Sequence, residues 1–329
     1  MNSKTLKEIE HLINEDPKKI IITSHKNPDG DAIGSSLALF GFLKSLGHNV
    51  EIIVPNRFPG FLEWIPNSNL INIYQNDLTK CDELISKADI IFSLDYNAFH
   101  RTGIMNDVLL NAKAIKILID HHLSPTQDFN LLYSNTNVSS TCELVYNLIE
   151  SFDLVTISKE IATALFVGIM TDTGSFSFSC NNPRTFIIVS KLIEHGIDIK
   201  EINQHVYHTN SENRTRLLGF CLSERLKVLK QEKTAYIYLS KEDLTKYNYQ
   251  IGDTEGIVNY ALAIQGVQLA ALFSEKDGLI RISFRSKSTF DVNQLARKHF
   301  DGGGHKNAAG GNSKLSLVDT LEKFESILK

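Results

Sequence analysis

Residues 19–34 read KIIITSHKNPDGDAIG. The apolar run over residues 20–22 predicts a buried strand, and the pattern over residues 32–46 predicts a helix. His25, Asp29 and Asp31 lie in the turn between the two. One imidazole and two carboxylates crowded into such a turn suit a hard or borderline divalent cation. The stretch therefore predicts both an α/β fold and a metal site.

The same alternation continues along the first half of the chain. Apolar, β-branched runs that predict strands occupy residues 19–23, 50–54, 90–94 and 115–119. Stretches with helical periodicity occupy residues 32–46, 139–150 and 158–171. Continuous apolar runs that alternate with amphipathic helices indicate a parallel sheet with helices on both faces.

The chain changes character after residue 182. Successive helices are predicted over residues 183–194, 199–207 and 213–229, and a second α/β pattern follows, with strands near 235–239, 268–273 and 279–286. A length of 329 residues also suits two domains. We expect a metal-binding catalytic domain over residues 1–185, a helical linker over 186–227 and a smaller α/β domain over 228–329.

Composition excludes several classes of protein. The formal net charge of −4 is too close to neutral for a protein that binds long duplex DNA without sequence preference. The longest apolar runs, such as residues 164–170, are too short to cross a bilayer, and residues 1–18 lack a signal-peptide apolar core. The four cysteines are widely scattered, which argues against structural zinc and against a disulfide framework. We therefore expect a cytoplasmic protein.

Two further predicted strands end in polar groups. Asp95 follows residues 90–94, and Asp120, His121 and His122 follow residues 115–119. Ligands of open parallel sheets bind at the carboxyl ends of the strands, so these side chains are expected to converge with the first turn. Asp172 follows the apolar helix over residues 161–170 and can reach the same edge.

Each residue taken alone also has a structural explanation. His25 would more often cap a helix or face solvent, Asp31 would be the N-cap of the following helix, and Asp120 would only orient a histidine. Asp95 would end a strand, and Asp172 would belong to a turn. Their joint placement at one edge favours the metal site.

The order and spacing of these residues resemble the four-motif signature of the DHH phosphoesterase superfamily. Residues 302–310 read GGGHKNAAG and resemble the signature of that superfamily's DHHA1 substrate domain. The resemblance covers nearly the whole chain. Its size and two-domain layout are similar to those of the nanoRNase/pAp phosphatase group, which degrades very short RNAs and 3′-phosphoadenosine 5′-phosphate (pAp).

The resemblance implies two Mn²⁺ ions. One ion would be held by His25, Asp29 and Asp95, and the other by Asp31, Asp95, His121 and Asp172, with Asp95 as the bridge. Asp95, Asp120 and His122 would be the catalytic residues, with Asp120 holding His121 from behind and His122 facing the substrate phosphate. Carboxylate-rich ligation without thiolates favours manganese over zinc and leaves Mg²⁺ and Co²⁺ open.

Further residues are candidates for substrate contacts. Arg101 matches an arginine that the family places near the substrate. Arg285 lies on the strand predicted over residues 279–286, and its guanidinium matches phosphate geometry. Gly302, Gly303 and Gly304 allow backbone amides to cluster into an anion-holding nest, and His305 adds a donor beside it.

The expected function is a Mn²⁺-dependent phosphoesterase that hydrolyses short 5′-phosphorylated oligoribonucleotides to mononucleotides, and pAp to AMP and phosphate. A cyclic-dinucleotide or pApA phosphodiesterase stays open as an alternative. A non-catalytic nucleotide sensor ranks last, because such a protein would normally have lost some ligands. The expected partners are short RNAs and nucleotide bisphosphates, with no membrane and no long duplex DNA, and a homodimer stays open.

Overall fold

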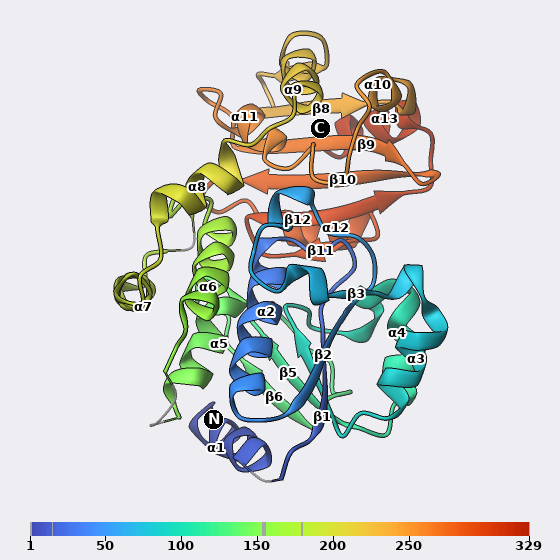
Figure 1. The fold of residues 1–329 in the computed structure, drawn as a ribbon. Coiled ribbons are helices and arrows are strands. Elements are labelled where there is room, and N and C mark those ends of the chain that lie inside the picture. Colours follow the sequence, from blue (N-terminus) through green and yellow to red (C-terminus); the bar gives the residue numbers. More distant parts are fainter. Residues whose placement is uncertain (1, 15, 153–155, 179, 329) are drawn as a thin grey trace. The chain divides into compact units, whose positions relative to one another are not determined.

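The computed structural model describes residues 2–14, 16–152, 156–178 and 180–328 (Figure 1). The chain divides into two compact units, Met1–Thr209 and Asn210–Lys329. This division lies inside the linker expected over residues 186–227. The helices α7 (Pro183–Glu194) and α8 (Ile199–Tyr207) belong to the first unit, and α9 (Glu212–Glu224) belongs to the second. The three-part division of the chain stays a prediction.

The first unit is built on a six-stranded parallel sheet. Its strands are β1 (Lys19–Thr23), β2 (Asn49–Val54), β3 (Asn72–Ile73), β4 (Ile90–Leu94), β5 (Ile115–Asp120) and β6 (Leu131–Ser134). They lie in the order β3-β2-β1-β4-β5-β6 with parallel pairing throughout. The chain order reverses between β1 and β4, where Thr23 pairs with Ser93. Open α/β sheets bind their ligands at such a switch point.

Helices cover both faces of this sheet (Figure 1). Successive side chains of a strand point to opposite faces, so Ile20 and Ile22 of β1 enter one apolar core and Ile21 enters the other. The first core includes residues of α1 (Asn2–Asn14), α2 (Gly30–Ser45), α5 (Thr141–Glu150), α6 (Lys159–Asp172), α7 and α8. The second includes residues of α3 (Leu78–Ser86) and α4 (Asn106–Asn111). The predicted parallel sheet between two helical layers is confirmed.

Short 3₁₀ helices complete the first unit. They are η1 (Gly60–Leu62), η2 (Ser68–Leu70), η3 (Tyr74–Asn76) and η4 (Phe99–Met105). No helix in the described part of the chain is long and apolar enough to cross a membrane.

Glycines let α2 and α6 pack closely against each other. A Cβ atom at Gly30 would lie 2.2 Å from Oγ1 of Thr171, and one at Gly34 would lie 2.5 Å from a backbone oxygen of α6. The start of α2 therefore lies beside the end of α6. This packing brings Asp31, near the start of α2, to the same edge of the sheet as Asp172, the last residue of α6.

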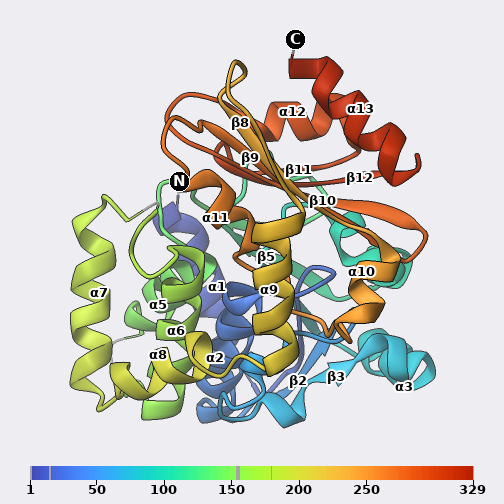
Figure 2. The same cartoon turned by 90° about the horizontal axis from the view of Figure 1, so that it is seen from above.

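The second unit contains a mixed sheet. Its strands are β7 (Leu226–Leu229), β8 (Thr234–Leu239), β9 (Leu269–Lys276), β10 (Leu279–Ser286), β11 (Gly303–Gly304) and β12 (Ala308–Ser313), in the order β11-β12-β10-β9-β8-β7. β8 and β9 are parallel, and the other neighbours are antiparallel. One face is covered by α12 (Val292–His299) and α13 (Leu317–Leu328) and the other by α9 and α11 (Ile257–Leu262), with α10 (Lys241–Lys246) at the periphery (Figure 2). A second α/β domain was predicted and is confirmed.

One predicted helix is wrong at its end. The helix expected over residues 213–229 ends at Glu224, and Leu226–Leu229 is strand β7. β7 pairs antiparallel with β8, and the turn between them passes through Lys233, whose φ is 50°. Cross-strand pairs with β8 outweigh the weak local preference of these residues for a helix.

Candidate metal centre

The loop after β1 fixes the first two candidate ligands. Asp29 is the N-cap of α2, because its Oδ1 accepts hydrogen bonds of 3.1 Å from the backbone N–H groups of Asp31 and Ala32. Nδ1 of His25 lies 2.9 Å from the carbonyl oxygen of Lys26. A carbonyl only accepts, so Nδ1 carries the proton and the neutral ring offers Nε2 to an ion. That Nε2 lies 3.9 Å from Oδ2 of Asp29.

Asp31 does not cap α2, since Asp29 has that place. Its buried carboxylate reaches the start of α5 instead. Oδ2 accepts a hydrogen bond of 2.6 Å from the N–H of Thr141, and Oδ1 accepts one of 2.9 Å from the N–H of Cys142. Oδ2 also lies 3.8 Å from Nε2 of His121.

Asp95 lies between the two candidate histidine ligands. It follows β4, is buried, and has a φ of 64°, a left-handed conformation that is uncommon for a residue with a side chain. Its Oδ2 lies 3.5 Å from Nε2 of His25, and its Oδ1 lies 3.4 Å from Nε2 of His121. Each oxygen faces a different imidazole, so Asp95 can give one oxygen to each of two ions.

Asp172 completes the cluster around His121. Its Oδ2 lies 3.6 Å from Nε2 of His121. The Asp172 side chain is 28% exposed, whereas that of His121 is 5% exposed, so the cluster is accessible at Asp172. The structure thus brings together all the ligands predicted from the sequence, at the switch point of the sheet.

Asp120 pairs with His122. The predicted partner of Asp120 is His121, whereas its Oδ1 lies 2.7 Å from Nδ1 of His122. Nδ1 is the donor, because an ionised carboxylate only accepts. Oδ2 of Asp120 is buried and has no hydrogen-bond partner in the structure as described. Nδ1 of His122 is also 3.7 Å from Oδ1 of Asp95, so this pair adjoins the candidate bridging ligand.

The donor atoms form two groups that share Asp95. His25, Asp29 and Asp95 place one donor atom each within 4.8 Å of the others, and so do Asp31, Asp95 and His121. Imidazole nitrogens and carboxylate oxygens in this arrangement suit manganese, magnesium or cobalt better than a thiolate-preferring ion.

The electrostatics of the cluster fit a cation. Burial, reinforced by the charges of Asp95 and Asp172, raises the pKa of Asp31 well above its usual value. Burial raises the pKa of Asp172 to about 6. Burial lowers the pKa of His121, but the neighbouring carboxylates outweigh it and raise this pKa to about 10. Burial and crowding therefore raise the pKa values of Asp31 and Asp172, and divalent ions bound here would supply compensating positive charge.

Arg101 lies beside the His25 loop, and its contact with a substrate stays a prediction. Its carbonyl oxygen accepts a hydrogen bond of 2.8 Å from the N–H of Lys26. The pKa of His25 is lowered by burial and by the charge of Arg101, but Asp95 and Asp29 outweigh both and raise it. Arg101 is therefore close enough to act electrostatically on the ligand cluster.

The substrate residues expected in the second unit gather around β12. Arg285 of β10 is paired with Ala308, and the N–H of His305 donates a hydrogen bond of 2.7 Å to the carbonyl oxygen of Ala308. The backbones of Arg285 and His305 therefore both adjoin Ala308 of β12. Their contact with a substrate stays a prediction.

Two of the three glycines expected to form an anion-holding nest, Gly303 and Gly304, form strand β11, and the N–H of Gly304 donates a hydrogen bond of 3.1 Å to Oδ1 of Asn293. A contact of the glycines with a substrate stays a prediction. The glycines also have a steric role. A Cβ atom at Gly302 would lie 2.1 Å from the carbonyl oxygen of Gly310, so only glycine lets this segment approach β12 so closely.

The helix predicted over residues 139–150 corresponds to α5, but the contact of its first residues with Asp31 was not predicted. Ser140 caps this helix by accepting a hydrogen bond of 3.2 Å from the N–H of Glu143, a pattern that predicts a helix start locally. That signal does not say that Thr141 and Cys142 contact Asp31, which is more than a hundred positions away in the sequence.

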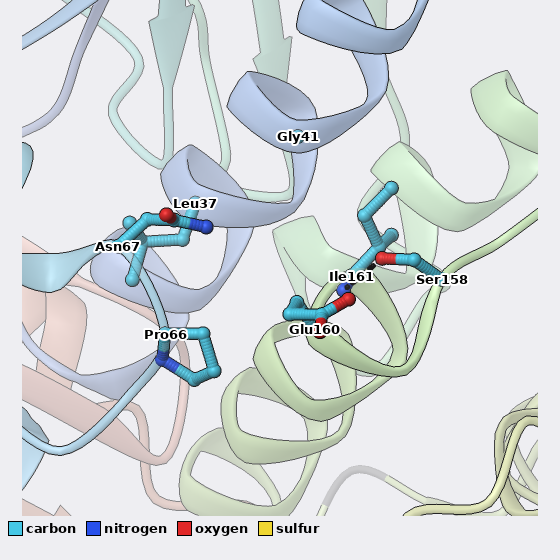
Figure 3. A pocket seen from close by; sticks show the side chains of 7 residues that line it. All are labelled: Leu37, Gly41, Pro66, Asn67, Ser158, Glu160 and Ile161. Atoms are coloured by element: carbon cyan, nitrogen blue, oxygen red, sulfur yellow. Dashed lines mark hydrogen bonds between the residues drawn. The ribbon is translucent and has the colours of Figure 1, made fainter.

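A separate cavity of about 300 Å³ lies between the middle of α2 and the start of α6 (Figure 3). It is lined by Leu37, Gly41, Pro66, Asn67, Ser158, Glu160 and Ile161. Ile161 and Asp172 stand near opposite ends of α6, roughly 16 Å apart along its axis. The cavity is therefore not part of the metal centre.

The two units match two described protein families. The first matches the DHH family, N-terminal domain, over residues 19–169, and the second matches the DHHA1 domain over residues 232–329. The chain is 30% identical over 314 residues to a probable bifunctional oligoribonuclease and PAP phosphatase, NrnA, from Streptococcus mutans, covering 94% of this chain and 95% of that protein. It is 27% identical to the cyclic-di-AMP phosphodiesterase PdeA from Listeria monocytogenes, covering 93% of this chain and 46% of that protein.

A solved structure has the same fold over nearly the whole length. It is that of an exopolyphosphatase-related protein from Bacteroides fragilis, which is 42% identical and superposes with a TM-score of 0.93. The match covers 99% of this chain and 96% of that protein.

Proposed function

Because this chain belongs to the DHH/DHHA1 phosphoesterase family, we propose that it hydrolyses short 5′-phosphorylated oligoribonucleotides to mononucleotides, and pAp to AMP and phosphate, with two Mn²⁺ ions. One observation carries the two-ion proposal. The two carboxylate oxygens of Asp95 lie 3.5 Å and 3.4 Å from the Nε2 atoms of two different histidines. A carboxylate in that position suits a bridge between two ions.

The proposed ligand sets follow the two groups of donor atoms. His25, Asp29 and Asp95 would hold one ion, and Asp31, Asp95, His121 and Asp172 would hold the other. When bound, two divalent ions polarise the phosphoryl oxygens and bring the pKa of water toward neutrality, so hydrolysis needs no serine or cysteine nucleophile.

His122 is the proposed proton donor. Its Nδ1 donates a hydrogen bond to Oδ1 of Asp120, which orients the ring, and Nε2 is the proposed site of proton exchange with the substrate. When water attacks phosphorus, the bond between phosphorus and the leaving oxygen breaks. The leaving oxygen then takes a proton from Nε2 of the charged His122 ring, which the buried carboxylate of Asp120 stabilises until that transfer, and the proton lost by the attacking water restores the ring for the next turnover. Arg101 would offset negative charge that develops on the phosphoryl group.

Charge and similarity support a short substrate. The formal net charge of −4 gives little attraction for long nucleic acids, which are bound through many phosphate contacts. The relative from S. mutans, named an oligoribonuclease and PAP phosphatase, matches over 95% of its length.

Hydrolysis of cyclic dinucleotides is the second candidate. PdeA from L. monocytogenes, named a cyclic-di-AMP phosphodiesterase, matches 93% of this chain. The match covers only 46% of PdeA, which ranks this candidate below the first.

A substrate panel with Mn²⁺ tests the proposal. It contains 5′-phosphorylated dinucleotides, longer RNA, pAp, cyclic dinucleotides and pyrophosphate, and products are separated by chromatography. We expect mononucleotides from the dinucleotides and AMP from pAp, and we expect neither from the Asp95→Asn variant. Asp128→Asn is the matched control, because Asp128 is an exposed aspartate of the same unit. Preferential turnover of cyclic dinucleotides or pyrophosphate would replace the proposed substrates.

A further inference from the structure

We infer that the start of α5 is a positioning element for the two-ion centre, and that Thr141 fixes the carboxylate of Asp31 relative to that of Asp95. This inference rests on the proposed function, because it assigns Asp31 and Asp95 to a centre with two ions. Thr141 contacts no substrate in this role and acts through the two carboxylates.

Thr141 touches both carboxylates at once. Its N–H donates a hydrogen bond of 2.6 Å to Oδ2 of Asp31, and its hydroxyl donates one of 3.0 Å to Oδ1 of Asp95. These are the two oxygens that lie 3.8 Å and 3.4 Å from Nε2 of His121. Thr141 therefore sets the separation of the oxygens that would bind the second ion.

The helix reinforces this contact. Oδ1 of Asp31 accepts a hydrogen bond of 2.9 Å from the N–H of Cys142, so both oxygens of this carboxylate are held by the first amides of α5. Amides at the start of a helix carry partial positive charge, which attracts and orients a carboxylate placed there. Each carboxylate oxygen retains a second lone pair, which it can give to an ion.

Glu143 holds the residues just before Thr141 in place through hydrogen bonds. It is fully buried, and its Oε2 accepts hydrogen bonds from the N–H and the hydroxyl of Ser139, at 3.1 Å and 2.7 Å. The same oxygen accepts a hydrogen bond of 2.8 Å from Oγ1 of Thr185 in α7. The residues that precede Thr141 are therefore tied to a second helix, and the loop has little freedom to move away from Asp31.

Gly168 of α6 leaves room for the contact. A Cβ atom at this position would lie 2.1 Å from Sγ of Cys142 and 3.0 Å from Oδ1 of Asp31. Three segments that are distant in the sequence, at the starts of α2 and α5 and in α6, thus meet around one carboxylate.

The test removes the Thr141 hydroxyl and measures metal binding. The full chain is stripped of metal and titrated with Mn²⁺ by calorimetry, and electron paramagnetic resonance reports magnetic coupling between neighbouring ions. We expect two coupled ions in the wild type. In Thr141→Val, which keeps the N–H but loses the hydroxyl, we expect the second ion to bind about 10- to 100-fold more weakly, the range found when a partner of a metal ligand is lost. Thr141→Ser keeps the hydroxyl and should bind both ions as the wild type does.

Thr163→Val is the matched control. Thr163 is a buried threonine of α6. Its hydroxyl donates a hydrogen bond of 2.8 Å to the carbonyl oxygen of Lys159 and contacts none of the candidate ligands. It should leave Mn²⁺ binding unchanged. If Thr141→Val does not fold, Thr141→Ala removes the same hydroxyl without adding a methyl group and should show the same loss.

Two results would overturn the inference, and they have different consequences for the proposed function. Wild-type affinity and coupling in a folded Thr141→Val variant would remove Thr141 from the centre and leave the proposed function standing. A wild-type chain that binds fewer than two ions would overturn the two-ion centre itself, and this inference with it.

Discussion

His122 donates a hydrogen bond of 2.7 Å from Nδ1 to Oδ1 of Asp120, the last residue of β5. The pair resembles in its chemistry the histidine–aspartate pairs that orient a ring for proton transfer. Asp120→Asn should therefore lower kcat on pAp by roughly 10²–10⁴-fold, the usual contribution of a positioned acid or base. Mn²⁺ stoichiometry is the companion measurement. An unchanged kcat in a metal-loaded variant would contradict a proton-transfer role for this pair.

Removal of metal should destabilise the first unit. A ligand that binds only the folded state stabilises it, by about 2.7 kcal/mol when its free concentration is a hundred times its Kd. Mn²⁺ added to the stripped protein should raise Tm in a concentration-dependent way. The rise should be smaller in Asp95→Asn, because Asp95 is the candidate ligand of both ions. An equal rise in Tm on addition of Mn²⁺ to the two proteins, measured by thermal melting, would argue against Asp95 as the bridge.

Gly168→Ala should weaken the centre even though alanine favours helices over glycine by about 1 kcal/mol. The new methyl group would meet Sγ of Cys142 at 2.1 Å, so the start of α5 or α6 has to shift away from Asp31. We expect lower Mn²⁺ affinity and a lower Tm. Gly219→Ala in α9 is the control, because a Cβ atom there meets nothing within 4 Å and should raise Tm. A Gly168→Ala protein that is more stable and binds Mn²⁺ normally would refute the close packing.

Arg285→Ala should raise KM for pAp and leave Mn²⁺ binding unchanged, because Arg285 belongs to the second unit and not to the ligand cluster. Loss of a hydrogen bond to a charged group costs about 1.5–3 kcal/mol, so an increase of roughly 10- to 100-fold is expected. Arg281→Ala is the control, because Arg281 lies on the same face of β10 and donates a hydrogen bond of 2.7 Å to Oδ1 of Asn312. Equal KM values for wild type and Arg285→Ala would exclude a phosphate contact.

His48 should make stability depend on pH near neutrality. Its Nδ1 accepts a hydrogen bond of 3.1 Å from the N–H of Lys18, and its Nε2 donates one of 2.9 Å to the carbonyl oxygen of Ile13 in α1. Burial, helped by the charge of Lys18, lowers the pKa of His48 below its usual 6.5. Below that pH the unfolded chain binds a proton that the folded chain does not, so the free energy of unfolding falls as pH decreases from about 7.

The His48→Gln variant isolates this effect. Denaturant unfolding at several pH values between 5 and 8 should show a shallower pH dependence in the variant than in the wild type. Parallel curves for the two proteins would show that His48 does not take up a proton on unfolding in this range.

The sequence was enough to predict the class of the fold and the set of candidate ligands. Strands β1, β4 and β5 are short, continuous apolar runs, and His25, Asp95 and His121 follow their ends directly. In a parallel sheet the ends of neighbouring strands lie at one edge, so local periodicity alone predicts that these side chains meet. The family and the enzymatic class followed from the same residues and are confirmed.

Other elements could not be predicted from local patterns. β3 and β11 have two residues each, too few for a periodic signal, and β7 is a strand only because β8 lies beside it. The glycines before His305 permit close packing against β12, in addition to the anion contact predicted for them. A glycine run has no periodicity of its own, so only its neighbours in space decide what it does.

What the sequence determined by itself is which residues are candidates for the chemistry, because the ends of strands and helices are set by residues next to them in the chain. What only the tertiary structure decided is how those residues are oriented. Asp31 turns to the start of α5, Asp95 faces two histidines, and Asp120 pairs with His122 rather than His121. Each of these orientations depends on the packing of α2, α5 and α6 around the sheet, and side-chain contacts between distant segments leave no periodic trace in the sequence.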